Sequence, residues 1–191
     1  VSQQTQLDEI TGNRLTQCFN YRGGYYDRCE REFRGFHQLL QRDTEASAAE
    51  RAAVGFSAPI LSKTWYHTGE AVDPPRDRYY ARDPLAVALQ STLLHKYHFN
   101  DRASQAFTDF DEDTAREVAR ALSGRVLRSE IYAADDDPAS AVPYVVSENR
   151  ALVRALRLKG KHQPYAVLQP LDLESISYQY EPALADDPLC Q

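Results

Sequence analysis

A single helical pattern stands among many short strand-like segments, and this uneven distribution constrains the fold more than any other sequence feature. The pattern lies between about Asp111 and Ser123, where acidic residues come first and Gly124 follows, as expected at the two ends of a helix. Its apolar residues recur at helical spacing: Ala115, Val118, Ala119 and Leu122. Because they form one apolar stripe, we expect this helix to pack on a sheet.

The remaining regular segments favour strands, because they alternate or are rich in aromatic and β-branched residues. They are residues 14–22, 32–36, 59–68, 125–132, 143–147, 150–158, and 166–168 continuing near 173–180. A turn is expected at Gly23-Gly24, between the first two. Strands, then a helix, then strands disfavour a parallel doubly wound fold. The sequence thus predicts a mainly β (β-rich α+β) fold, an antiparallel, meander-like sheet of about seven strands with one packed helix.

The chain is expected to be a single segment, residues 1–191, of a longer polypeptide, since it contains no Met. Proline and aspartate interrupt its middle, where regular structure is hard to sustain. The expected organisation is strands over 1–70, an irregular loop region over 71–110, helix then strand over 111–132, strands over 133–183 and a linker over 184–191.

Charge and cysteine content exclude several classes of protein. The net charge is -6 and the pI about 5.4, so nucleic acid is not an expected partner. No apolar run approaches the length of a membrane span, and no signal peptide is visible, so no membrane contact is expected. The three cysteines, Cys18, Cys29 and Cys190, fit neither a disulfide scaffold nor a zinc site, and we expect buried free thiols. A Cys18–Cys29 bridge across a hairpin is the alternative.

Three patterns suggest chemistry, and each has a simpler interpretation. Glu30 and Glu32 have the spacing of arginine-directed ADP-ribosyltransferases, but they fit ion pairs with Arg28, Arg31 and Arg34 better. His95 and His98 lack a third metal ligand, and residues 135–137, all Asp, lack the alternation of a calcium loop. We therefore assign no catalytic, cofactor-binding or metal residue and expect a protein that is not an enzyme.

Residues 11–27, with TGNRL at 11–15 and YRGGYYD at 21–27, resemble an RHS/YD unit, in which a glycine turn and a Tyr-Asp pair delimit short strands. Further similar motifs follow in order: REFRGF at 31–36, QRDTE at 41–45, TWYHTG at 64–69, ALSGRVLRSEIY at 121–132, PYVVSE at 143–148 and SYQYE at 177–181. Through them nearly the whole chain resembles the middle region of the B component of bacterial insecticidal Tc toxin complexes. Cys29 and residues 85–107 depart from the family pattern.

The resemblance implies a structural function. In this family the B and C components wrap RHS/YD strands into a hollow shell around a cytotoxic effector, and the B component docks onto the pore-forming A component. This chain is then expected to be part of the shell, in contact with the rest of its own B chain and with the C component, and only indirectly with the A component. The whole complex would be a secreted virulence factor that is synthesised in the bacterial cytoplasm.

The alternative is a non-catalytic β binding module that contacts the A component or a glycan or protein on the host surface. The two hypotheses differ in their aromatic residues. A shell segment predicts a sheet interior around Tyr25, Tyr26, Phe33 and Phe36. A binding module predicts an exposed cluster of Trp65, Tyr66, Tyr79 and Tyr80. Exposed Phe33 and Phe36 together with Trp65 in a groove would contradict the shell hypothesis.

Overall fold

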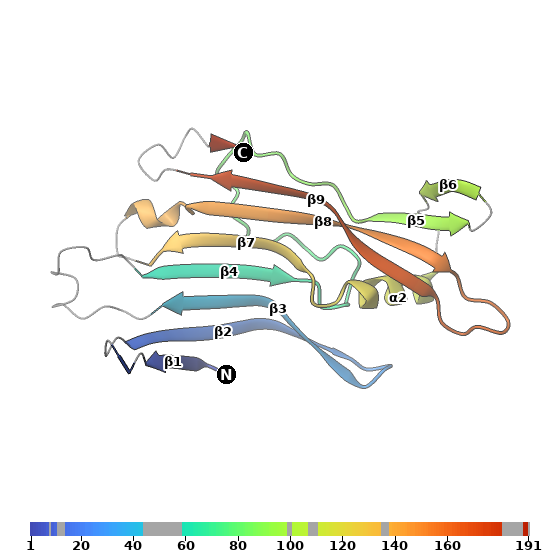
Figure 1. Cartoon of the computed structure of the whole chain (residues 1–191), viewed down its shortest axis with the longest axis horizontal. Helices are drawn as coiled ribbons and strands as arrows, with labels where there is room; N and C mark the ends of the chain where they lie inside the picture. The colour runs from blue at the N-terminus through green and yellow to red at the C-terminus, as the bar shows by residue number, and fades with distance from the viewer. Residues whose placement is uncertain are drawn as a thin grey trace.

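The computed structural model describes residues 1–7, 9–10, 14–43, 59–98, 101–106, 111–134, 138–180 and 189–190. These residues form ten strands, one α-helix and one short 3-10 helix (Figure 1). The strands are β1 (Gln3–Leu7), β2 (Arg14–Asp27), β3 (Glu32–Asp43), β4 (Ile60–Tyr66), β5 (Leu93–His98), β6 (Asp101–Ala106), β7 (Val126–Ala133), β8 (Val145–Arg157), β9 (Val167–Gln179) and β10 (Leu189–Cys190). The helices are α2 (Glu112–Leu122) and the 3-10 helix η1 (Pro138–Ala141).

All ten described strands belong to one sheet, which follows a meander with an insertion. Strands β1, β2, β3, β4, β7, β8 and β9 are neighbours in that order, and every pairing among them is antiparallel. The segment between β4 and β7 contributes the β5–β6 hairpin, which joins β8 through the parallel pairing of β5. The prediction of a mainly β fold with one packed helix is confirmed, although the sheet has more strands than predicted.

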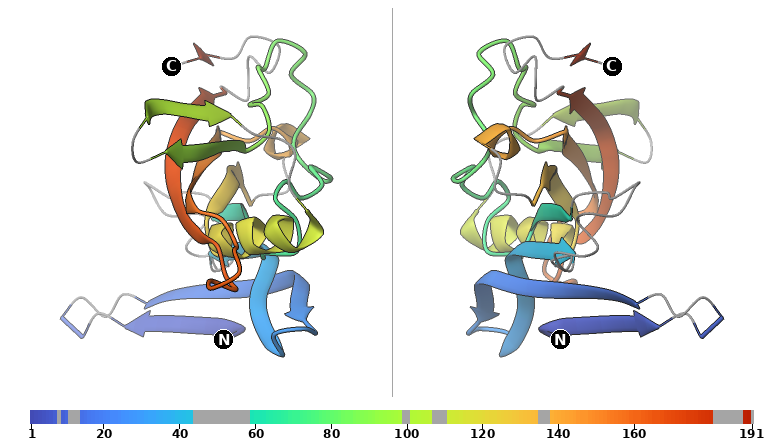
Figure 2. Two further views of the ribbon diagram at one scale, coloured as in Figure 1. Left: turned by 90° about the vertical axis from the view of Figure 1, so that its right-hand side faces the viewer. Right: turned by 90° about the vertical axis from the view of Figure 1, so that its left-hand side faces the viewer.

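Strand β8 lies at the centre of this arrangement and has different neighbours along its two halves. Strand β9 pairs with it over almost its full length. On the other side, β7 pairs with residues 145–148 and β5 with residues 152–155. Figure 1 shows the change, with β7 beside one half of β8 and β5 beside the other. In Figure 2, β1 and β2 lie below the curved remainder of the sheet, to which β3 connects them.

The turn expected at Gly23-Gly24 is wrong, because β2 continues through both glycines to Asp27. Gly23 has a φ of 63°, which suits glycine, and a Cβ on Gly24 would lie 3.2 Å from the Phe36 ring on β3. The glycines therefore let the two strands approach closely. The chain reverses at residues 28–31, where the Asp27 carboxylate accepts hydrogen bonds from the N–H groups of Cys29 and Glu30.

Other predicted boundaries also move because strand pairing overrides local sequence. The predicted irregular region, 71–110, contains β5 and β6. The separate strands expected at 143–147 and 150–158 are one strand, β8, and the expected linker, 184–191, contains β10, which pairs with β9. Residues 11–13 of the TGNRL motif and the aspartates at 135–137 lie outside the described residues.

The predicted helix is confirmed together with its ends. Asp111 is the N-cap, and its carboxylate accepts a hydrogen bond of 2.7 Å from the Thr114 N–H. Gly124 follows with a φ of 84°. The buried stripe packs against β5 and β8 in a cluster that we call the helix core: Leu94, Val118, Leu122, Ala151 and Val153. In the described part of the chain, no helix is long and apolar enough to cross a membrane.

The expectation of buried thiols is wrong for Cys18 and Cys29, which are free and exposed. Cys18 lies in β2 opposite Arg42 of β3, whereas Cys29 lies in the turn that follows the same strand. A bridge across the hairpin needs cysteines on opposite strands, so the structure does not support the Cys18–Cys29 alternative.

Candidate functional site

The residues that suggested chemistry lie in three separate places. Glu30, in the turn, and Glu32, at the start of β3, are exposed and lie 3.9 and 4.0 Å from the Arg120 guanidinium of α2. Of the predicted ion-pair partners, Arg34 lies 3.8 Å from Glu32. His95 and His98 both belong to β5. Among the residues with described positions, no group of three His, Cys, Asp or Glu side chains could hold a metal ion.

The most elaborate arrangement is a buried ionic cluster of side chains on β7 and β8 that also binds the backbone of Tyr80, which lies between β4 and β5. We call this set the strap network: Tyr80, Arg128, Glu130, Tyr132 and Glu148. The Arg128 guanidinium donates hydrogen bonds to Glu130 at 2.7 Å and to Glu148 at 3.0 Å. The Tyr132 hydroxyl donates to the other Glu130 oxygen at 2.5 Å. Glu130 is completely buried, so its charge depends on these donors for stabilisation.

The strap network binds an irregular segment, residues 71–92, which we call the strap. The Tyr80 N–H donates to Glu130 at 2.8 Å, and Arg128 donates to the Tyr80 carbonyl at 3.0 Å. Further along, the Val87 N–H donates to the Tyr178 hydroxyl at 2.7 Å, and that hydroxyl is 3.2 Å from the Val87 carbonyl. The strap is neither helix nor strand, so side chains of the sheet provide hydrogen-bond partners for its backbone N–H and C=O groups.

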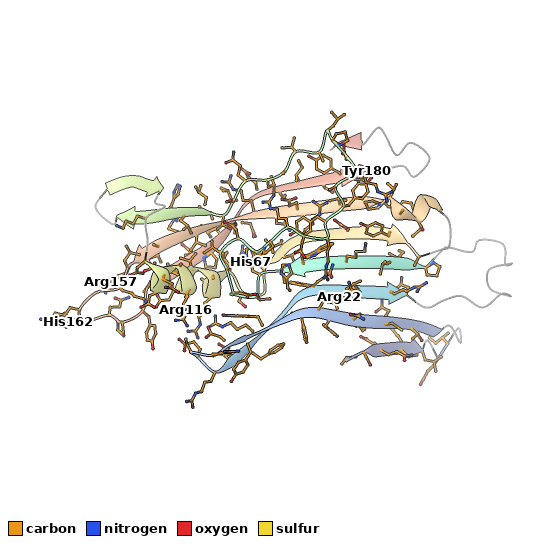
Figure 3. The ribbon with its side chains drawn as sticks, turned by 180° about the vertical axis from the view of Figure 1, so that it is seen from behind. Arg22, His67, Arg116, Arg157, His162 and Tyr180 are labelled. Carbon is orange, nitrogen blue, oxygen red and sulfur yellow. The ribbon has the colours of Figure 1, made fainter. Side chains whose placement is uncertain are left out.

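Aromatic rings fill the space between the strap and the sheet. Tyr79 packs edge-on against Trp65, with ring centroids 5.0 Å apart, and the Arg128 guanidinium lies 4.7 Å from the Tyr79 ring. Tyr80 packs against Tyr180 in the same manner at 5.5 Å. Tyr178 and Tyr180 also join an apolar cluster with Val142 and Val146. Figure 3 shows Tyr180 at the opposite end of the sheet from Arg116 of α2.

Burial determines the ionisation of groups around the strap. It raises the pKa of Tyr79 to about 12 and, with the Glu130 carboxylate as the next cause, raises the pKa of Tyr132 further. Burial also lowers the pKa of Lys63, whose ammonium lies 3.9 Å from the centre of the Tyr132 ring. The tyrosines therefore remain neutral hydroxyls at neutral pH, as donors and packing groups.

A cavity of about 260 Å³ remains between the strap and the sheet. Its walls include the charged groups of Arg76, Arg128 and Glu148, but these are already paired, with Arg76 3.1 Å from Glu148. The described geometry is that of a structural clamp in which few polar groups are available for a ligand.

A second ionic cluster joins the β2–β3 hairpin to α2. The buried Asp27 carboxylate accepts a hydrogen bond of 2.8 Å from Arg34 and lies 3.6 Å from Arg116. The hydrogen bond from the Glu30 N–H is the largest cause of its lowered pKa, followed in the same direction by the Cys29 N–H. The Ser123 hydroxyl, next to α2, donates to the Arg34 carbonyl at 3.5 Å. These contacts position the hairpin against the helix.

The aromatic residues do not follow either sequence prediction. Phe33 and Phe36, expected inside the sheet, are 52% and 39% exposed, and Tyr26 is 53% exposed. Trp65, expected on the surface by the binding-module hypothesis, is 1% exposed beneath Tyr79. The exposure of Phe33 and Phe36 therefore counts against the shell hypothesis, which would be contradicted if Trp65 also lay in a groove. Trp65 does border a small cavity of about 220 Å³, but as part of the core under the strap.

Sequence reasoning missed the strap network entirely. Arg128, Glu130 and Tyr132 occupy alternate positions of β7 and so share one side of the strand. This alternate spacing was the sequence feature that could have indicated the network. The same spacing is equally typical of a solvent-exposed side of a strand, because the strap that buries these residues is remote in sequence.

Comparison with known proteins gives a consistent result. The family model of the insecticide toxin TcdB middle/N-terminal region matches residues 1–69, and that of the middle/C-terminal region matches residues 117–191. The solved TcdB2-TccC3-Cdc42 and TcdB2-TccC3 structures are each 38% identical to this chain, with TM-scores of 0.85 and 0.84, and each match covers 98% of this chain. The Photorhabdus luminescens Tc holotoxin pore is 37% identical over 98% of this chain, with a TM-score of 0.83.

This chain spans 9% of the length of the matched TcdB2-TccC3 chains and 8% of that of the matched holotoxin chain. None of the curated proteins matches it.

Proposed function

This chain belongs to the TcdB insecticide toxins, as part of their middle region, and we propose that it is a structural segment of the hollow shell of a Tc toxin B component. The shell is built from RHS/YD repeats, encloses a cytotoxic effector and helps to deliver it. The observation that carries the proposal is the match to TcdB2-TccC3 over 98% of this chain at 38% identity. The segment contributes no catalysis and needs no cofactor.

The sheet itself is suited to such a role. Among the described strands, β1 pairs only with β2 and β6 only with β5, so the sheet has edges available for further pairing. An open edge is a hazard for an isolated domain but a means of continuation within a larger sheet. The proposed partners are accordingly the rest of the B chain and the C component, with the A component reached indirectly in the secreted complex.

The exposed aromatic residues favour a second candidate, a non-catalytic binding module for the A component or for a glycan or protein on the host surface. Tyr26, Phe33 and Phe36 would supply the contact area. The buried position of Trp65 reduces the aromatic surface that this candidate requires.

The two candidates are separable in the complete B–C complex by limited proteolysis of the enclosed effector. The Glu130→Ala variant removes an acceptor from the strap network and should open the wall, so that the effector is cleaved faster. Glu174→Ala is the matched control, because it removes an exposed carboxylate that pairs with Arg150 at 3.3 Å. Full protection of the effector, in a Glu130→Ala complex whose segment exchanges amide hydrogens faster, contradicts the shell function. Weaker binding to the A component without faster cleavage would favour the binding module.

A further inference from the structure

A groove of about 300 Å³ runs beside the β2–β3 hairpin, on a surface that the strap and α2 leave uncovered. Tyr21, Phe36 and Tyr66 form its aromatic walls. The Tyr21 and Phe36 rings, each 39% exposed, contact each other at a centroid distance of 5.0 Å. Phe33 extends the apolar surface through an edge-on contact of 5.1 Å with Phe36. Such a continuous apolar surface is typical of a protein contact.

One buried polar atom beside the groove, Nδ1 of His67, lacks a hydrogen-bond partner among the described residues. His67, labelled in Figure 3, is 3% exposed. Backbone hydrogen bonds with Gly124 and Arg125 hold it in place. Burial lowers the pKa of His67 to about 4, so its imidazole is neutral at pH 7. Buried polar groups are rarely left unpaired in native proteins, so this atom favours a partner from outside the described residues.

The floor of the groove permits close approach of a second backbone. Gly35 and Gly124 both line it, with φ values of 105° and 84°. A Cβ built on either residue would meet no atom within 4 Å. The space next to these glycines is therefore open, and a neighbouring chain can lie directly against the backbone.

We propose that this groove is the seat of another segment of the same toxin polypeptide, which inserts an apolar side chain between Tyr21, Phe36 and Tyr66 and hydrogen-bonds to His67. The inference rests on the proposed function as a shell segment. The length of the matched TcdB2-TccC3 chain supports this occupant, because this chain spans only 9% of it and the rest of such a polypeptide is available to cover the groove. A tethered segment also has a high effective concentration, which a separate protein lacks.

Photo-crosslinking in the complete B–C complex tests the inference. The photoreactive residue p-benzoyl-phenylalanine replaces Phe36, and mass spectrometry identifies the crosslinked peptide. We expect a crosslink within the B chain to a peptide outside residues 1–191. A crosslink to the C component, to a second copy or to an added host protein overturns the proposal, and so does the absence of any crosslink. Replacement of Tyr21 gives a second probe on the same groove if the first variant does not assemble.

Protease protection of the effector, measured on the same samples, separates this inference from the proposed function. A protected effector without the expected crosslink overturns the groove assignment alone. An effector that is unprotected in the unmodified complex overturns the shell function itself. Replacement of Leu85, an exposed residue of the strap, by the same photoreactive residue controls for non-specific crosslinking, and its products should differ from those at position 36.

Discussion

The helix core and the strap network both include residues of β8, but α2 and the strap cover the sheet by different physical means. Under α2 the contacts are apolar, made by residues such as Val118, Leu122 and Val153. Under the strap, charged and hydrogen-bonded contacts centred on Arg128 and Glu130 accompany the aromatic packing. A helix satisfies its own backbone and needs only apolar contact to pack, whereas an irregular segment needs partners for its N–H and C=O groups. The nature of each core follows from the element that covers it.

The two regions also use different residues of β8. Its buried positions are even-numbered at Val146 and Glu148 and odd-numbered from Ala151 to Ala155. The change coincides with an irregular register against β9, between Arg150 and Ala151. One half of β8 therefore buries residues beneath the strap, and the other half buries residues beneath α2.

Loss of Glu130 should produce the largest effect. In the Glu130→Ala variant the buried Arg128 loses its closest acceptor and the Tyr80 N–H loses its partner, and we expect the free energy of unfolding to fall by about 3 to 5 kcal/mol. Denaturant unfolding of the chain measures it. The Arg150–Glu174 pair provides the control, because Glu174 is exposed and Glu174→Ala should cost less than about 1 kcal/mol. Equal costs for the two variants would show that the strap network contributes no more than a surface ion pair.

The helix core should be nearly as sensitive to truncation but far more tolerant of shape-conserving changes. Leu122 is completely buried, and Leu122→Ala should lower the free energy of unfolding by about 2 to 5 kcal/mol, whereas Leu122→Met should cost less than about 1.5 kcal/mol. Glu130→Gln, which also conserves shape, should remain costly because it unbalances a buried charge. The same denaturant titration compares all three. A Glu130→Gln variant as stable as Leu122→Met would remove the distinction between the regions.

Acid should weaken the junction at the end of β4, where His67 lies. Its pKa is about 4 in the folded chain and about 6.5 when unfolded, so between these values the unfolded state binds more protons. Stability should be complete above pH 6.5 and fall by about 2 to 3 kcal/mol as the pH drops to 4. The free energy of unfolding, measured at several pH values in this range, should depend less on pH in His67→Gln. It should depend on pH as strongly as before in His162→Gln, which alters an exposed histidine. An unchanged slope in His67→Gln would exclude His67 as the cause.

Removing one hydroxyl from the strap should give the smallest effect. Tyr178→Phe takes away the group that binds both the N–H and the carbonyl of Val87, at an expected cost of about 1 to 2 kcal/mol. Hydrogen exchange should report it locally, as faster exchange of the Val87 amide with little change in α2. Tyr144→Phe, at an exposed tyrosine, is the matched control. Faster exchange throughout the helix would mean that the two regions do not behave independently.

Much of the secondary structure could be predicted from the sequence, but several boundaries could not. The polar pair Glu148 and Asn149 suggests a break between two strands. In the structure Glu148 binds Arg128, and the Asn149 side chain donates to the Val126 carbonyl, so partners remote in sequence make this pair compatible with a strand. The candidate sites behave likewise, since no local pattern shows that Arg128 and Glu130 are buried or that Phe33 and Phe36 are exposed.

The sequence by itself determined the mainly β class, the position and caps of α2 and the family resemblance, because periodicity, capping residues and motif order are local properties. Only the tertiary structure decided which side of each strand is covered, that the 71–92 segment is held down by buried charges, and that the β2–β3 hairpin presents an aromatic groove. Burial is a property of the elements packed on a residue, and those elements are far away in the chain. The resemblance thus indicated a shell segment, and the fold located the surface at which its neighbour is proposed to bind.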